Sequence, residues 1–133
     1  MADAGSGGTA TIRRERDRTP QVEKRREHML TREERYEQAE SLKNEGRLMD
    51  AVVELEKLVA DHADFALAHS ALAAWCTRLE RHEDAVRHAR RVCELEPKDP
   101  FSFTALSVAC MRGGRIAEAE EALARSRMLQ AGG

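Results

Sequence analysis

The sequence is poor in aromatic residues and proline and has no long apolar stretch. Aromatic residues make up only 4% of its 133 residues, too few for a β-sandwich, whose core is rich in aromatic and β-branched residues. Proline occurs only at positions 20, 97 and 100, so most of the chain is free to be helical. No segment approaches the roughly 20 apolar residues that span a bilayer, and the first residues lack the apolar core of a signal peptide. We therefore expect a soluble, cytoplasmic protein without a membrane span.

The chain also lacks a strong excess of one charge and any catalytic motif. Its 22 basic and 24 acidic residues give a net charge of −2, whereas a nucleic-acid-binding domain usually carries a basic face. Three widely spaced cysteines suit neither a disulfide framework nor a metal site, which needs close pairs of ligands. Phosphate-binding glycine loops, nucleophile elbows and metalloprotease motifs are missing. These absences predict a protein that has no cofactor and no nucleic-acid partner and is not an enzyme.

The first 30 residues differ in composition from the rest. Residues 1–11 are small and polar, and residues 12–30 are dense in charges of both signs. Such segments bury too little apolar surface to offset the entropy of ordering. We therefore predict a disordered, charged arm over residues 1–30. Thr19 and Pro20 suit a helix start, so the arm has room for a short helix over residues 20–29, and it is a candidate to fold on contact with a partner.

From Thr31 onward the sequence repeats with a period of 34 residues. Thr31 and Glu34 have the spacing of a capping box, which marks the start of the first helix. The aligned positions are Ala39, Ala73 and Ser107; Gly46, Glu80 and Gly114; Arg47, Arg81 and Arg115; and Ala51, Ala85 and Ala119. A helix–turn–helix unit of this length is a solenoid repeat, which buries its apolar face only by stacking on its neighbours.

Each repeat contains two predicted helices. Their predicted spans are 32–45 and 48–61, 66–79 and 82–95, and 100–112 and 116–129. The small residues of the repeat let the two helices of a pair approach closely, and larger apolar residues fill the remaining space. Pro97 and Pro100 mark the connection between the second and third repeats. We therefore predict one all-α domain over residues 31–130, with repeats at 32–65, 66–99 and 100–133.

These residues resemble the tetratricopeptide repeat (TPR) family. The matching residues are Ala39, Ala51 and Leu58 in repeat 1; Leu72, Ala73, Ala85 and Pro97 in repeat 2; and Phe103, Leu106, Ser107 and Ala119 in repeat 3. The position that is aromatic in the family holds Leu42, Cys76 and Cys110, so we expect leaner packing. The resemblance implies a right-handed superhelix whose concave face is built from the first helix of each repeat.

That concave face is the candidate binding site. By the family's geometry it is lined by Tyr36, Glu40, Lys43, Leu67, Ser70, Ala74, Thr77, Phe101, Thr104, Val108 and Met111. Repeat 1 contributes mostly charged and polar residues, and repeats 2 and 3 contribute an apolar surface that suits an amphipathic helix or an extended peptide. The resemblance implies an adaptor that binds a segment of another protein there. The basic clamp with which chaperone-binding members hold a carboxylate is absent, so we do not predict chaperone-tail binding.

An alternative function is that of a homo-oligomeric structural subunit. Second-helix positions that are apolar in repeats 1 and 2 become charged in repeat 3, as Glu120 and Arg127 show. Such charged ends favour a closed three-repeat unit. Leu123, Met128 and Leu129 stay apolar near the same end, so self-association is kept as the alternative and the oligomeric state is left open.

Three further features each have two interpretations. The cysteines Cys76, Cys93 and Cys110 are expected on inward helix faces, as small core residues rather than ligands. Trp75 either packs between repeats 1 and 2 or is an exposed anchor for a partner. A basic strip on the second helix of repeat 2 is either a solvated face paired with acidic neighbours or a site for an acidic partner. The strip consists of Arg78, Arg81, His82, Arg87, His88, Arg90 and Arg91.

Overall fold

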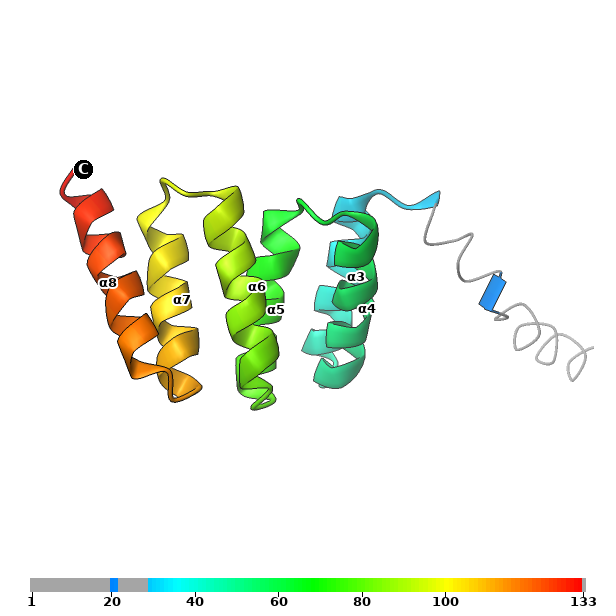
Figure 1. Cartoon of the computed structure of the whole chain (residues 1–133). Helices are drawn as coiled ribbons and strands as arrows, with labels where there is room; N and C mark the ends of the chain where they lie inside the picture. Colours follow the sequence, from blue (N-terminus) through cyan, green and yellow to red (C-terminus); the bar gives the residue numbers. More distant parts are fainter. Residues whose placement is uncertain (1–19, 22–28, 133) are drawn as a thin grey trace, which may run out of the picture. The chain divides into compact units, whose positions relative to one another are not determined.

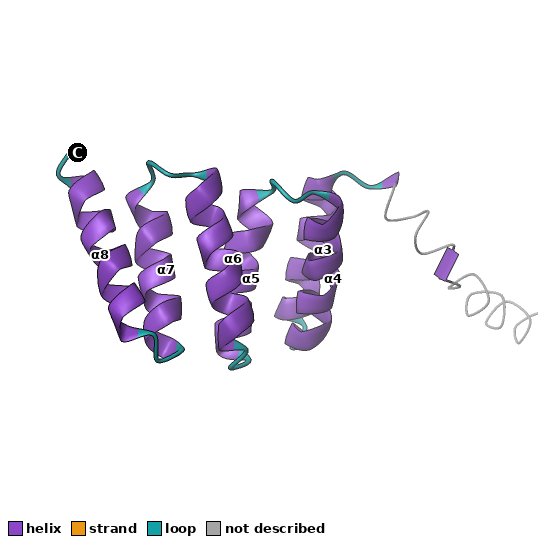
Figure 2. Ribbon diagram, viewed as in Figure 1, coloured by secondary structure: helices purple, strands orange, loops and turns teal. Residues whose placement is uncertain are grey.

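The computed structural model of the protein describes residues 20–21 and 29–132. Over residues 29–132 the regular structure consists of the six helices α3 to α8, with no strand (Figures 1 and 2). The expected arm lies almost wholly outside the described residues. Of the short helix expected over residues 20–29, only Pro20, Gln21 and Met29 are described. No helix in the described part of the chain is both long and apolar enough to cross a bilayer.

The six helices confirm the predicted spans. They are α3 (Arg32–Asn44), α4 (Leu48–Asp61), α5 (Ala66–Arg78), α6 (His82–Leu95), α7 (Pro100–Arg112) and α8 (Ile116–Gln130). Every helix begins at the predicted residue and ends within one residue of the predicted end. The spans are accurate because the helix ends are encoded locally. The assignment of repeats to 32–65, 66–99 and 100–133 stays a prediction.

Side-chain caps define two of the helix starts. The Thr31 backbone N–H donates to Glu34 Oε1 at 3.0 Å, and the Glu34 N–H donates to Thr31 Oγ1 at 3.1 Å. This reciprocal pair is the predicted capping box of α3. At α7 the Asp99 carboxylate accepts from the Phe101 N–H at 3.0 Å, and Pro100 occupies the first helical position, where no N–H is needed.

The first helix of each repeat ends in the same type of turn. In each, a backbone N–H just beyond the helix bonds to the carbonyl five residues earlier, which is the Schellman arrangement. These bonds run from Arg47 to Leu42 (2.9 Å), from Arg81 to Cys76 (2.8 Å) and from Arg115 to Cys110 (2.8 Å). The residue before each arginine is left-handed, with φ of 83° at Gly46, 60° at Glu80 and 78° at Gly114. Glu80 therefore adopts a conformation that suits glycine better.

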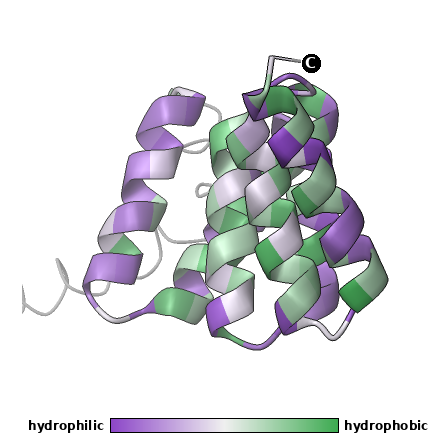
Figure 3. Cartoon of the chain, turned by 90° about the vertical axis from the view of Figure 1, so that its left-hand side faces the viewer, coloured by the Kyte–Doolittle hydropathy of each residue, from purple (hydrophilic) through white to green (hydrophobic). Residues whose placement is uncertain are grey.

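The unit Tyr36–Gly133 is held together by a core of small and medium-sized residues. The aligned residues Ala51, Ala85 and Ala119 are fully buried. In repeat 3 the Ser107 hydroxyl donates to the Ala119 carbonyl at 2.8 Å, so the small residues of the two helices meet directly. Along the helices, α5 packs against α6, and α7 packs against both α6 and α8 (Figure 1). Polar and apolar residues alternate along the helices, and none is apolar throughout (Figure 3).

Candidate functional site

The predicted site residues lie at helical spacing along α3, α5 and α7. Residues that recur every three or four positions share one face of a helix, and α5 lies against α7. All of the predicted residues keep part of their surface in solvent. The exposed fractions of the large apolar side chains are 51% for Leu67, 73% for Phe101, 50% for Val108 and 50% for Met111. We call these four residues the apolar face.

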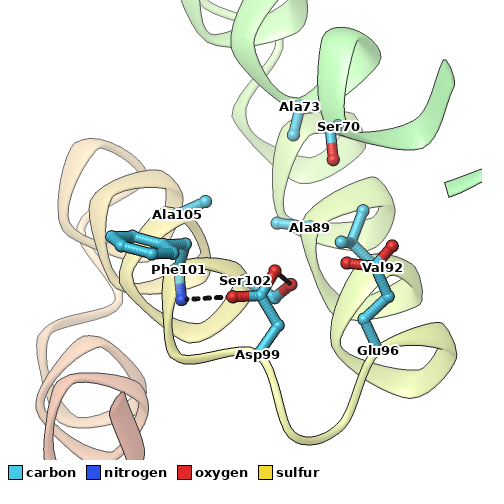
Figure 4. Close-up of a pocket in the computed structure, with 9 residues that line it drawn as sticks. All are labelled: Ser70, Ala73, Ala89, Val92, Glu96, Asp99, Phe101, Ser102 and Ala105. Carbon is cyan, nitrogen blue, oxygen red and sulfur yellow. Dashed lines mark hydrogen bonds between the residues drawn. The ribbon is translucent and has the colours of Figure 1, made fainter. Parts of the chain in front are cut away.

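A pocket of about 140 Å³ lies where α5, α6 and α7 meet (Figure 4). Small apolar side chains from all three helices line it, namely Ala73, Ala89, Val92 and Ala105. Polar and aromatic groups complete the lining, namely Ser70, Glu96, Asp99, Phe101 and Ser102. The pocket thus brings together Ser70 and Phe101 of the predicted site. It does not include the other predicted residues, which lie elsewhere on the first helices.

The contribution of α6 to this pocket was not predicted from the sequence. The concave face was predicted from the first helices alone, yet Ala89 and Val92 of α6 and Glu96, its C-cap residue, line the pocket. The alignment of the three repeats contains a difference from which this contribution could have been predicted. Repeat 1 has Leu55 and repeat 3 has Leu123 at the position of Ala89. The pocket therefore lies where repeat 2 lacks a leucine side chain that both of its neighbours have.

The two carboxylates of the pocket differ in their bonding. Asp99 caps α7, and its other oxygen accepts from the Ser102 hydroxyl at 3.3 Å (Figure 4). Glu96 is exposed and forms no ion pair with any described residue. Glu96 is exposed and Asp99 is partly exposed, so the two carboxylates give the pocket a negative edge.

Other predicted site residues are engaged within the fold. The Lys43 ammonium lies 5.3 Å from the centre of the Trp75 ring. The Tyr36 ring packs edge-to-face on Phe65, with 6.2 Å between ring centroids. Burial and the charge of Glu40 raise the pKa of Tyr36, so its hydroxyl stays protonated at neutral pH. Trp75 itself is only 5% exposed, which confirms the packing interpretation and excludes an exposed anchor.

The two threonines of the predicted site also bond internally. The Thr77 hydroxyl donates to the Ala73 carbonyl at 2.8 Å. The Thr104 hydroxyl lies 3.2 Å from the Pro100 carbonyl and 2.8 Å from the hydroxyl of Ser126 on α8. The Thr77 hydroxyl is thus engaged within α5 and the Thr104 hydroxyl joins α7 to α8, so the apolar side chains dominate what the face offers to a partner.

The cysteines are buried and free, as expected of core residues. Burial raises the pKa of Cys76 and of Cys93 to about 11, so both are thiols at neutral pH. Within residues 20–21 and 29–132 no group of three or more His, Cys, Asp or Glu side chains is placed to hold a metal ion.

The basic strip on α6 is largely neutralised by carboxylates. Arg81 pairs with Asp84 at 2.7 Å and with Glu56 on α4 at 3.1 Å. Arg90 donates to both oxygens of Glu118 on α8, each at 2.7 Å. These pairs favour the solvated, ion-paired interpretation. The strip nonetheless needs a correction at His88, which the charge pattern placed on this face and which is only 6% exposed.

His88 instead forms a buried pair with His69 of α5. Their Nδ1 atoms are 3.0 Å apart, and His69 Nε2 lies 2.9 Å from the Ala63 carbonyl. Burial lowers the pKa of both imidazoles, so both are neutral at neutral pH. A carbonyl only accepts, so neutral His69 carries its proton on Nε2 and accepts at Nδ1. His88 then donates from Nδ1, which leaves its Nε2 as a buried acceptor with no hydrogen-bond partner among the described residues.

Comparison with known proteins shows the fold. No protein-family model and no curated protein matches the sequence. Among solved structures, MamA aligns with a TM-score of 0.69 and 15% identity over 76% of this chain, and the chain spans only 59% of MamA. The translocator chaperone SycD of Yersinia enterocolitica aligns at a TM-score of 0.67 and 21% identity, over 76% of both chains. The second TPR of Spaghetti (RPAP3), bound to an HSP90 peptide, aligns at 0.67 and 15% identity, over 80% of this chain and 98% of that one.

These likenesses define the class of the protein. Six helices in the TPR arrangement, three turns of identical hydrogen bonding and alanines buried at every 34th residue all belong to one architecture. The chain therefore has the all-α helical-repeat fold of tetratricopeptide proteins. At identities this low the comparison extends to the fold and not to a partner.

Proposed function

We propose that this protein is an interaction module that binds a peptide or amphipathic helix of another protein on the face formed by α3, α5 and α7. The apolar face carries the proposal, because Phe101 is 73% exposed and Leu67, Val108 and Met111 are each about half exposed. Large apolar groups gathered on one surface mark interaction sites. The role is binding without a cofactor, and we place it in the cytoplasm, as the sequence leads us to expect.

Two structural neighbours support this proposal. The Spaghetti (RPAP3) repeat domain is bound to a peptide, and SycD is a translocator chaperone. Both support a role in which this fold binds a segment of another protein. The nature of the partner for this chain follows from its own surface, which is apolar on α5 and α7 and more polar on α3.

The test compares partner capture by two surface variants. One variant replaces the apolar face (Leu67→Ser, Phe101→Ser, Val108→Ser, Met111→Ser). The matched control replaces Met49 and Val53 of α4, which are 68% and 46% exposed, by serine. Circular dichroism and a urea titration establish that both are folded. We expect pull-down from native lysate to lose a partner only with the apolar-face variant. Retention of every partner by that variant would remove the basis of the proposal.

Self-association is a second candidate because Met128 on α8 is 57% exposed and SycD was solved as a dimer. Sedimentation equilibrium of wild type and Met128→Glu distinguishes the two. A dimer that dissociates in the variant favours a structural subunit. A wild-type monomer leaves partner binding as the function.

A further inference from the structure

We propose that the pocket between α5, α6 and α7 receives a basic side chain, arginine or lysine, from the bound partner segment. This inference rests on the proposed function and specifies the chemistry of the partner. It follows from three features of the pocket: its origin in a missing leucine, the two kinds of group that line it and the availability of the Glu96 carboxylate.

The pocket is a gap in an otherwise repeated core. Leu55 in repeat 1 is fully buried at the position that Ala89 occupies in repeat 2. Ala89 is itself almost fully buried, so its methyl group lies beneath the pocket rather than filling it. The fold closes this position in repeat 1 with the chain's own side chain. In repeat 2 the same place is open to a side chain from outside.

The lining matches a side chain that is apolar along its length and positive at its end. Methyl groups of Ala73, Ala89 and Ala105 suit the methylene stem of arginine or lysine. The carboxylates of Glu96 and Asp99 suit the charged head. The Phe101 ring also lines the pocket (Figure 4), and a guanidinium stacks well on an aromatic face. An acidic side chain would be repelled by both carboxylates.

The Glu96 carboxylate is available to a ligand. Three other carboxylates of α6 and α8 are paired within the fold: Asp84 with Arg81 and Arg87, Glu94 with Arg91, and Glu118 with Arg90. Glu96 has no such pair with a described residue, and no lysine or arginine lines the pocket. Lys98 follows two residues later but is not among the lining residues. The negative edge is therefore left for a cation that the partner brings.

The test begins with selection from a displayed random-peptide library by the full chain. We expect peptides with apolar residues and one position enriched in arginine or lysine. Glu96→Gln should lose that enrichment. Glu94→Gln is the matched control, because Glu94 is an exposed carboxylate two residues before Glu96 but lies outside the pocket lining. This control should select the same peptides as wild type.

The contribution of the peptide's positive charge to affinity is then measured with one selected peptide. Fluorescence anisotropy compares the peptide with an analogue in which norleucine replaces the basic residue. We expect the analogue to bind wild type about tenfold more weakly, the size of one charge-assisted hydrogen bond, and to bind Glu96→Gln as well as the parent does. Ala89→Leu fills the pocket with the residue of repeats 1 and 3, so it should weaken the parent peptide by a similar factor while the fold is kept or stabilised.

The outcomes separate this inference from the proposed function. Selected peptides that need the apolar face but show no basic preference overturn the pocket assignment and leave the binding module intact. Failure to select any peptide that depends on the apolar face counts against both. A wild-type dimer that becomes monomeric on Ala89→Leu would assign the pocket to a second copy of the chain and overturn the inference.

Discussion

Mild acid should destabilise the protein through the His69–His88 pair. Burial, the neighbouring His69 and the charge of Arg87 lower the pKa of His88 to about 4, and Asp84 opposes them only weakly. Burial also lowers the pKa of His69, against the hydrogen bond to Ala63 and with some help from Arg91. In the unfolded chain both imidazoles titrate near pH 6.5. Below that pH the unfolded chain binds protons that the folded chain does not, so the free energy of unfolding falls as the pH falls.

The size of this loss of stability can be worked out from His88 alone. With a pKa of about 4 in the folded state and about 6.5 in the unfolded state, the loss of stability between pH 8 and pH 5 is at most about 2 kcal/mol. The loss continues until the pH reaches the folded pKa and then levels off. For a small domain, whose whole stability is about 5–15 kcal/mol, this is a readily measured change. His69 adds to it in the same direction.

The assay is urea unfolding followed by circular dichroism at pH 8, 6.5 and 5. The control is the double variant His69→Phe/His88→Ala, which copies Phe103 and Ala122, the residues of repeat 3 at the aligned positions. Ala122 is buried and Phe103 packs against the core, so the fold already accommodates this pair. Wild type should lose stability steadily below pH 6.5, and the double variant should stay nearly level. The same decline in both proteins would refute the account of the pair.

Three more predictions follow from the fold. Glu80→Gly should raise the free energy of unfolding by about 0.5–1 kcal/mol, because glycine suits the left-handed φ of 60° there. Glu80→Ala should not raise it, and the midpoints of urea unfolding of the two variants test this difference. Glu118→Gln should cost about 0.5–1 kcal/mol by breaking the bidentate pair with Arg90, and the difference from wild type should shrink in high salt. The three cysteines, all buried, should resist a thiol reagent at neutral pH in the folded protein and react fully in urea, and rapid reaction without denaturant would contradict their place in the core.

The fold was predictable because its signals are local or strictly periodic. The capping box at Thr31 and the residues preceding Arg47, Arg81 and Arg115 mark helix ends wherever the chain lies in space. The 34-residue period then sets which faces pack, because identical turns bring identical positions together. This also explains how the fold persists where the family's aromatic position holds cysteine. Burial of small residues at the helix contacts supports the pairs without large rings.

The candidate site was only partly predictable. Residues of the first helices follow from the family's geometry, and their exposure agrees with a surface role. Whether the second helix of a repeat reaches that surface depends on the size of its side chains, which is why the prediction did not include Ala89 and Glu96. His88 was placed on the basic strip because charge pattern along α6 dominates the sequence there. Its partner His69 lies on another helix, and pairing between helices depends on their relative rotation.

Departures from the repeat are of two kinds, and the difference indicates where a ligand fits. Ser126 stands where repeats 1 and 2 have Leu58 and Val92, and its hydroxyl donates to the Pro100 carbonyl at 2.9 Å, next to Thr104. The chain thus compensates for that lost apolar side chain with hydrogen bonds of its own. At Ala89 the lost leucine has no such compensation, and the space stays open beside two carboxylates. The protein does not fill this gap with a side chain of its own and does not neutralise the charge at its border. A partner's side chain therefore contributes most to binding at this place in the fold.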